Sequence, residues 1–159
     1  MKKTPNGKFY RLFIMLGVAE GTFTNCLPLL LLDGTFFLNA YHQTILLAIG
    51  RDGDNRPYLI AWAIVESENT KSWTWFIQQI IAGCPSLNEP VKATRSSKDI
   101  QTTVMSDQDK GLLNAEKKAL PMASQAFCAW HLAEIIKKKF GQKARHAFWK
   151  LVYVQTLGQ

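Results

Sequence analysis

The stretch Leu27–Leu32, LPLLLL, is an uninterrupted apolar run that is followed by the acid Asp33. A short run without charge is typical of a strand buried on both faces, as the central strands of a helix-covered sheet are. Gly34 and Thr35 come next, and these residue types permit a tight exit from a strand and local hydrogen bonding. The run therefore predicts a core strand that ends at Asp33 and carries a carboxylate to the edge of a sheet.

Two further apolar runs, Ile45–Ile49 and Tyr58–Val65, are separated by the sequence RDGDNRP. Asp-Gly and Asp-Asn are turn formers, so these runs predict a β-hairpin. No segment before or within the hairpin is long enough for a crossover helix, which a parallel pairing would need. The three strands therefore form a predicted antiparallel meander.

The spacing of apolar residues changes after the hairpin, from a pattern typical of strands to one typical of a helix. The side chains of one helix face are Trp73, Phe76, Ile77, Ile80 and Ile81. Asn69 or Thr70 is the expected N-cap, and Gly83 and Pro85 are the expected stop. The spacing thus predicts a helix that packs on the sheet.

The segment Cys84–Gln101 is rich in proline, serine, asparagine and charge, and is predicted to be a surface loop. A short β-prone run, Thr102–Met105, comes next and leads to a second acid, Asp107. Apolar residues at helical spacing follow over 112–120. A second strand is therefore expected to end in an acid.

The last part of the chain predicts one more strand and two helices. The strand lies around Gln125–Cys128, and the helix after it stops at Gly141. Another amphipathic helix is expected to begin at Ala144. The fold class is α/β, a mixed sheet with a three-stranded antiparallel meander and parallel strands, flanked by helices.

The expected organisation has three parts. Residues 1–26 form a lead-in segment, for which LFIMLGVA predicts a helix rather than a signal peptide, since no convincing cleavage site follows. Residues 27–141 form the core, and residues 142–159 begin a helical insertion.

No apolar run reaches the length of about 20 residues that spans a bilayer, so no membrane association is expected. Three cysteines without framework spacing predict free thiols.

Asp33 and Asp107 are the candidate catalytic and metal-binding residues. Sites in open α/β sheets form at the carboxyl ends of strands, and facing carboxylates on parallel neighbours repel unless a cation lies between them. Oxygen ligands favour Mg²⁺ or Mn²⁺, which orient water or a hydroxyl for attack on a phosphodiester. Either acid alone is also a common turn starter. A phosphatase with an aspartyl nucleophile is excluded, because the position its nucleophile needs holds Leu31.

A formal charge of +7 suits a polyanionic partner such as DNA. The densest basic stretch is KKKFGQKARHAFWK, and its candidate phosphate contacts are Lys137, Lys138, Lys139, Lys143 and Arg145. Lysines at helix ends are as commonly just solvated. Trp75 and Trp149 are the tryptophans expected to face DNA, whereas Trp62 and Trp73 are expected in the core.

Three segments in order resemble the catalytic core of Mutator-like element transposases: LLLLDGTFFLNAYHQTILLAIGRDGDNRPYLIAWAIVESENTKSWTWFIQQI, VMSDQDKGLLNA and FCAWHLAEIIKKKFG. The resemblance covers Phe9–Phe140. It implies an RNase H-like fold and a DDE acid triad that cleaves and joins DNA strands with Mg²⁺ or Mn²⁺. It also implies transposon ends and target DNA as partners, a homo-oligomeric transposition complex and a nuclear location.

On the matching positions, the resemblance makes Asp33 the first acid of the triad and Asp107 the second. The third, a glutamate, follows a helical insertion in this family, and the chain stops at Gln159, so the fragment is expected to be inactive alone. Glu116 and Glu134 are expected to be solvated helix positions rather than substitutes. The alternative is a domesticated, catalytically dead domain that binds DNA or protein.

Cys128 and His131 form the CxxH signature of the family. Their spacing places both on one side of a helix start, either as half of a zinc site or as a buried cysteine beside a hydrogen-bonded histidine. Glu66 in VESEN is a possible accessory residue near the acids, or a cap at the entry of the following helix.

Overall fold

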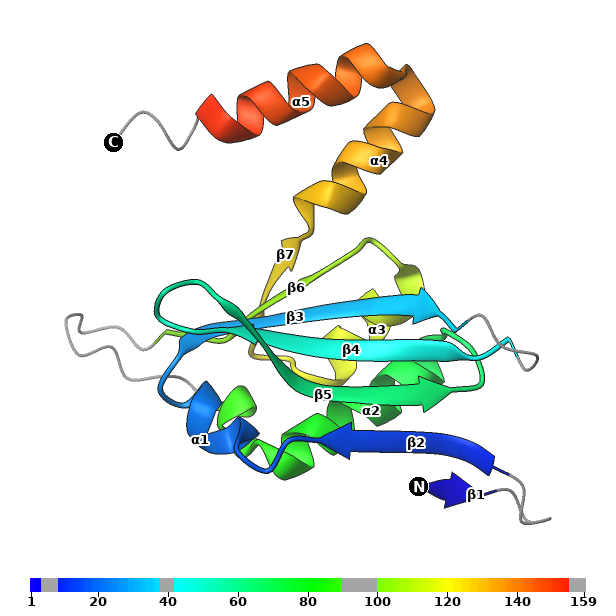
Figure 1. Cartoon of the computed structure of the whole chain (residues 1–159), viewed down its shortest axis with the longest axis vertical. Coiled ribbons are helices and arrows are strands. Elements are labelled where there is room, and N and C mark those ends of the chain that lie inside the picture. The colour runs from blue at the N-terminus through cyan, green and yellow to red at the C-terminus, as the bar shows by residue number, and fades with distance from the viewer. Residues whose placement is uncertain (4–8, 38–41, 90–99, 155–159) are drawn as a thin grey trace. The chain divides into compact units, whose positions relative to one another are not determined.

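A mixed seven-stranded sheet is the frame of the fold, with the strand order β1-β2-β5-β4-β3-β6-β7 (Figure 1). The computed structural model describes residues 1–3, 9–37, 42–89 and 100–154. The strands are β1 (Lys2–Lys3), β2 (Phe9–Met15), β3 (Leu27–Phe36), β4 (Thr44–Arg51), β5 (Pro57–Val65), β6 (Thr103–Ser106) and β7 (Ser124–Phe127). The chain divides into two compact units, Met1–Ala126 and Phe127–Gln159, of which the first holds nearly all of the sheet.

The predicted meander is confirmed. β3 pairs with β4 and β4 with β5, both antiparallel, and β6 pairs with β3 in parallel. The β4–β5 turn is held by Asp52, whose Oδ1 accepts hydrogen bonds from the backbone N–H groups of Asp54 (3.0 Å) and Arg56 (2.8 Å). The mixed, helix-flanked sheet is the expected architecture and is compatible with an RNase H-like fold.

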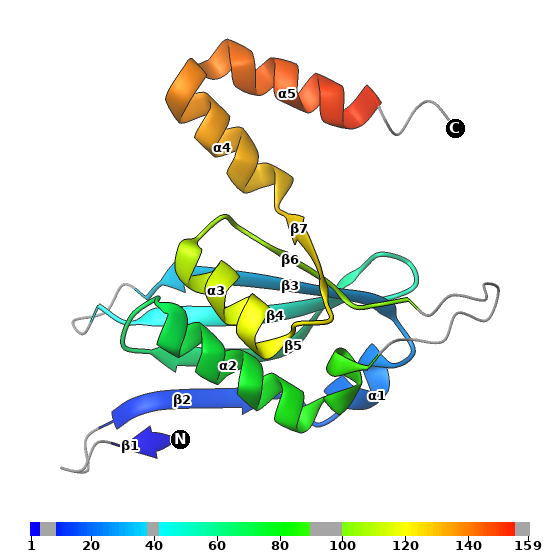
Figure 2. The ribbon, with the colours of Figure 1, turned by 180° about the vertical axis from the view of Figure 1, so that it is seen from behind.

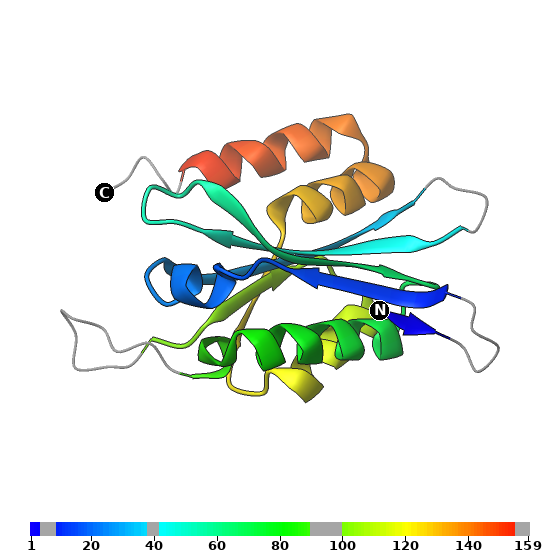
Figure 3. The ribbon, with the colours of Figure 1, turned by 60° about the horizontal axis from the view of Figure 1, so that its bottom comes forward.

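Helices α2 (Thr70–Gly83) and α3 (Lys110–Ala119) lie on the same face of the sheet, as Figures 2 and 3 show. The first unit also holds α1 (Ala19–Phe23) and the 3-10 helix η1 (Pro85–Asn88). The predicted N-cap of α2 is confirmed, since Asn69 accepts hydrogen bonds from the N–H groups of Lys71 and Ser72. The surface loop predicted over 84–101 lies outside the described residues from 90 to 99.

The core fills the space between the sheet and these two helices, because alternate strand residues point to the same face. The core residues contributed by the strands are Leu30, Leu32, Leu46, Ala48, Ala61, Ala63, Val65 and Val104. Those from the helices are Trp73, Phe76, Ile77, Ile80, Leu112 and Ala115. Burial of this apolar face stabilises the fold by about 25 cal/mol for each Å² removed from water.

The expected helix in the lead-in segment is wrong for most of its length. Phe9–Met15 forms strand β2, which pairs with β5 from Leu12 opposite Ile64 to Met15 opposite Ala61. Only Ala19–Phe23 is helical in the described part of this segment. The free edge of β5 offers a row of backbone hydrogen bonds, and this long-range pairing overrides a local apolar pattern that suits a helix equally well.

The second unit contains α4 (Ala129–Phe140) and α5 (Gln142–Val154). Gly141 joins the two helices with a φ of 84°, a conformation that favours glycine, so the predicted stop is confirmed. Arg145 Nε lies 2.9 Å from Glu134 Oε1, and its guanidinium lies 5.2 Å from the centre of the Trp130 ring. These contacts tie α5 to α4.

In the part of the chain that the structure describes, no helix is both long and apolar enough to cross a membrane. The cysteines are free thiols, as predicted: Cys26, Cys84 and Cys128.

Candidate functional site

Asp33 and Asp107 lie at the same end of two adjacent parallel strands. Leu31 of β3 is opposite Met105 of β6, and each aspartate lies two residues further along the chain. Asp33 is still within β3, whereas Asp107 directly follows the end of β6 at Ser106. Asp33 is exposed and Asp107 is half-buried.

Asp33 does not end its strand, contrary to the prediction. β3 continues to Phe36, which pairs with Thr44 of β4, and Asp33 itself is opposite Leu47. Its Oδ1 accepts a hydrogen bond of 3.0 Å from the backbone N–H of Gly34. The interpretation of Asp33 as a turn starter is therefore wrong, because the hairpin partner β4 holds the chain extended beyond it.

Asp107 does start a turn. Its Oδ1 accepts a hydrogen bond of 3.0 Å from the N–H of Asp109, and Asp109 caps α3 by accepting one of 2.9 Å from the N–H of Leu112. One oxygen of Asp107 thus has the role of a turn starter, which the sequence left open for this residue.

Glu68 is an acid near this site that the sequence pattern did not single out. Its Oε1 lies 2.6 Å from the position that a Cβ atom would take on Gly34, so the carboxylate packs directly on the glycine that follows Asp33. The same oxygen accepts a hydrogen bond of 3.2 Å from Nε1 of Trp73 in α2. The signal that could have indicated it is its place in VESEN, between a strand end and a helix cap.

The electrostatic setting of Glu68 links it to the aspartates. Burial raises the pKa of its carboxyl, the hydrogen bond from Trp73 opposes this, and the charges of Asp107, Asp109 and Asp33 raise it further. Like charges near one another destabilise the ionised form. The acids at this end of the sheet therefore form one negative region rather than separate groups.

Glu66 points to a different partner. It forms an ion pair with Arg11 of β2, in which Arg11 Nε donates to Glu66 Oε2 over 2.7 Å, and it accepts a hydrogen bond of 3.1 Å from the hydroxyl of Tyr10. Burial raises the pKa of Glu66, but the Arg11 hydrogen bond and charge outweigh it and lower the pKa. Glu66 fastens β2 to β5, and the helix cap is Asn69 instead.

The donor chemistry of the acid pair fits a hard divalent cation, because carboxylate oxygens are what Mg²⁺ and Mn²⁺ prefer. Within residues 1–3, 9–37, 42–89 and 100–154, no three histidine, cysteine, aspartate or glutamate side chains gather closely enough to hold one metal ion. Binding of such an ion by Asp33 and Asp107 as a pair therefore stays a prediction.

Comparison with known proteins shows which family the chain belongs to. The model of the MULE transposase domain matches residues 29–135, a span that contains both aspartates, Glu66 and Glu68. The chain belongs to the MULE transposase domain family. A curated relative, Protein FAR-RED IMPAIRED RESPONSE 1 of Arabidopsis thaliana, is 27% identical over 94 residues. That match covers 59% of this chain and 10% of the relative, so the chain spans about a tenth of that protein.

In this MULE transposase domain, Cys128 and His131 lie in the second unit. Cys128 is the N-cap residue of α4 and makes no side-chain capping bond, and its carbonyl accepts from the N–H of Leu132. His131 is half-buried, and its Nδ1 has no hydrogen-bond partner in the described part of the chain. The predicted hydrogen-bonded histidine is thus not seen at Nδ1, and whether the pair binds a ligand stays a prediction.

The residues predicted to contact DNA lie on both sides of the junction of α4 and α5. Lys137, Lys138 and Lys139 form the last turn of α4 and are exposed, as is Lys143 in α5. Lys137 Nζ lies 3.8 Å from Glu134 Oε2. Arg145 is half-buried against Glu134 and Trp130, so it holds the two helices together more than it faces solvent.

Trp75 does not face DNA, contrary to expectation. It is 8% exposed, its ring lies 6.4 Å from that of Phe13, and the Arg11 guanidinium lies 5.1 Å from it. The pairing of β2 with β5 brings these partners over α2 and buries the ring. Trp149 is half-buried in α5, where it stacks on Tyr153 at 5.9 Å.

Glu116 is buried, at 4% exposure, so its expected solvated position is wrong. It accepts a hydrogen bond of 2.5 Å from Gln125 Nε2 and lines a cavity of about 270 Å³ beside β7. Burial raises the pKa of its carboxyl. Residues of β6 and the edge strand β7 line the cavity beside Glu116, an arrangement that helical spacing alone does not reveal.

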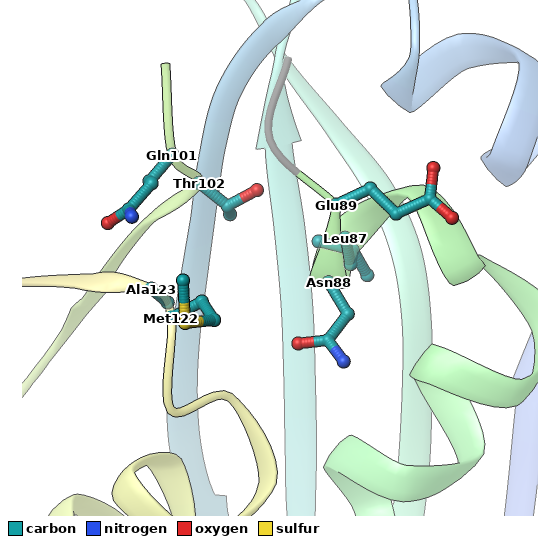
Figure 4. A pocket seen from close by; sticks show the side chains of 7 residues that line it. All are labelled: Leu87, Asn88, Glu89, Gln101, Thr102, Met122 and Ala123. Carbon is teal, nitrogen blue, oxygen red and sulfur yellow. The ribbon is translucent and has the colours of Figure 1, made fainter. Parts of the chain in front are cut away.

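A smaller pocket, of about 50 Å³, opens near the amino end of β6 (Figure 4). Its lining is Leu87, Asn88, Glu89, Gln101, Thr102, Met122 and Ala123. Because Asp107 follows the carboxyl end of β6, this pocket lies at the opposite end of the strand from the acid pair. It is separate from the candidate site.

Proposed function

We propose that this domain is the catalytic core of a DDE-type transposase, in which Asp33 and Asp107 hold Mg²⁺ or Mn²⁺ for cleavage and transfer of DNA strands. The observation that carries the proposal is that Asp33 and Asp107 each lie two residues beyond the paired residues Leu31 and Met105, at one end of the parallel pair β3 and β6. The family match, which spans both residues, supports it.

The residues of the chain have distinct tasks under this proposal. Asp33 projects from β3 where this strand is paired with β4, opposite Leu47, so hydrogen bonds between the strands hold its backbone extended. Oδ1 of Asp107 accepts a hydrogen bond within its turn, and the other carboxylate oxygen binds the ion. When bound, the cation supplies Lewis-acid activation for attack on a phosphodiester. Glu116, which is buried, and Glu134, which pairs with Arg145, are not proposed as the third acid of the triad.

The proposed partners are transposon ends and target DNA, met in the nucleus by an assembly of several copies. Exposed Lys138, Lys139 and Lys143 favour contact with a phosphate backbone, because each such contact adds affinity that is independent of base sequence. These lysines contribute to DNA binding and not to catalysis.

A second candidate function is a domesticated domain that binds DNA or protein without catalysis. The name of the curated relative refers to a far-red response and not to transposition, which favours this alternative. The two candidates differ in whether the acid pair is needed, since a binding domain depends on its basic surface only.

Titration calorimetry with Mn²⁺ on the wild-type chain, Asp33→Asn and Asp107→Asn tests the proposal, together with a nicking assay on supercoiled DNA. We expect Mn²⁺ binding by the wild type and loss of binding in both variants. Equal binding by all three proteins would exclude the acid pair as the metal site and favour the domesticated domain. Mn²⁺-dependent nicking that Asp33→Asn abolishes would show that this chain alone carries the activity.

A further inference from the structure

The residues Glu68–Thr70, here called the corner segment, contact both glycines that follow the aspartates. Glu68 packs on Gly34, and a Cβ atom on Gly111 would lie 3.1 Å from the backbone nitrogen of Thr70. Gly111 belongs to the first turn of α3, directly after the turn that Asp107 starts. The corner segment therefore touches the chain just beyond each acid.

We propose that Glu68 is a positioning residue for the acid pair, which holds the end of β3 through Gly34 and adds a third negative charge that draws the divalent cation to Asp33 and Asp107. This inference rests on the proposed function.

The carboxylate of Glu68 is held in place before any cation arrives. Trp73, its hydrogen-bond donor, is completely buried in the core, so the donor has little freedom to move. Gly34 has no side chain, and the carboxylate fills the space that a Cβ atom would occupy. When a ligand binds beside a fixed charge, the protein reorganises less than when the charge is on a mobile side chain.

Among the residues that the structure describes, no ion pair involves Glu68. Its hydrogen bond comes from the neutral indole of Trp73, whereas Glu66, two residues earlier, is neutralised by Arg11. In the ion-free state the charge of Glu68 adds to the repulsion among Asp33, Asp107 and Asp109, and a divalent cation at the acid pair relieves it. The attraction acts through space and does not require Glu68 to touch the ion.

Glu68→Gln separates this role from a structural one. Glutamine keeps an oxygen that accepts from Trp73 but carries no charge, so the ion-free protein should be as stable as the wild type or more so. We expect calorimetry to give Mn²⁺ binding that is about three- to tenfold weaker, the effect of one charge at partial screening. Glu68→Asp keeps the charge and should restore most of the affinity.

The matched control is Glu89→Gln, which removes one carboxylate at the pocket near the amino end of β6. It should leave Mn²⁺ affinity unchanged. Unaltered binding in Glu68→Gln, with binding lost in Asp33→Asn, would overturn the role of Glu68 and leave the proposed function standing. A parallel loss of affinity and ion-free stability in Glu68→Gln would mean a structural role only. Absence of Mn²⁺ binding in the wild type would overturn both proposals.

Discussion

The carboxylate of Glu68 lies on Gly34, with Oε1 only 2.6 Å from where a Cβ atom of that residue would be. The glycine of the DGT sequence is therefore favoured by a contact with a residue 34 positions later. Since Gly34 follows Asp33, this contact joins the end of β3 to the start of α2.

Gly34→Ala should displace the Glu68 carboxylate and break its hydrogen bond with Trp73. We expect the free energy of unfolding in urea to fall by about 0.5–1.5 kcal/mol, the net worth of one such bond. In a Glu68→Ala background the same change should cost less, since no carboxylate remains to be moved. Gly17→Ala, with nothing within 4 Å of its Cβ position, is the control. Additive effects of Gly34→Ala and Glu68→Ala would contradict the contact.

Mn²⁺ should stabilise the folded domain through the acid pair. An ion that binds only the folded state at ten times its dissociation constant adds about 1.4 kcal/mol to the free energy of unfolding. Thermal unfolding should therefore shift upward with Mn²⁺ in the wild type and stay fixed in Asp33→Asn and Asp107→Asn. A shift of the same size in these variants would place the ion elsewhere.

Arg11→Met should destabilise the domain strongly, because it leaves Glu66 without the cation that pairs with it. Arg11 is 6% exposed, so the loss is expected to be about 2–4 kcal/mol by urea unfolding. The control is Arg56→Met, whose ion pairs with Asp52 and Asp54 are at the surface and contribute about 0–1 kcal/mol. Similar losses in the two variants would contradict the structural role of the Arg11 pair.

Glu116 should make the stability depend on pH. Its folded-state pKa is raised above the ordinary value of 4.5, so the unfolded chain releases this proton first as the pH rises. The contribution of Glu116 to stability is full below pH 4.5 and is lost as the pH rises through the raised pKa. Urea unfolding from pH 4 to pH 8 should therefore show a decline in the wild type that Glu116→Gln reduces. An identical profile in the variant would argue against the burial of this carboxyl.

Lys138 and Lys143 should contribute to DNA binding through phosphate contacts. If each neutralises one phosphate of duplex DNA, Lys138→Gln with Lys143→Gln reduces the slope of log K against log salt by about 1.8. Fluorescence anisotropy with a labelled duplex at several salt concentrations measures this slope. Lys117→Gln with Lys118→Gln, at the exposed end of α3, removes the same charge elsewhere and should have a smaller effect. Equal effects would indicate attraction by net charge only.

The sequence by itself determined the elements whose signals are local. Apolar runs between turn formers gave β3, β4 and β5, and helical spacing with a capping asparagine at Asn69 gave α2. The position of Asp107 just after a strand also follows from local order, whereas the apolar run before Asp33 did not reveal that β3 continues to Phe36. These features are readable because period and capping depend on neighbours a few residues away.

The tertiary structure decided what depends on partners far along the chain. β2 is a strand because the edge of β5 is free, and that pairing buries Trp75 and gives Glu66 its cation, Arg11. Glu116 is buried because β6 and β7 cover its side of α3. The spacing of apolar residues in the sequence does not predict this burial. Glu68 contacts Gly34 only when the segment that leads into α2 lies against β3. The contacts of Arg11 and Glu68 cross tens of residues, and that of Glu116 joins two separate elements, so their energy exists only once the sheet and its helices have assembled.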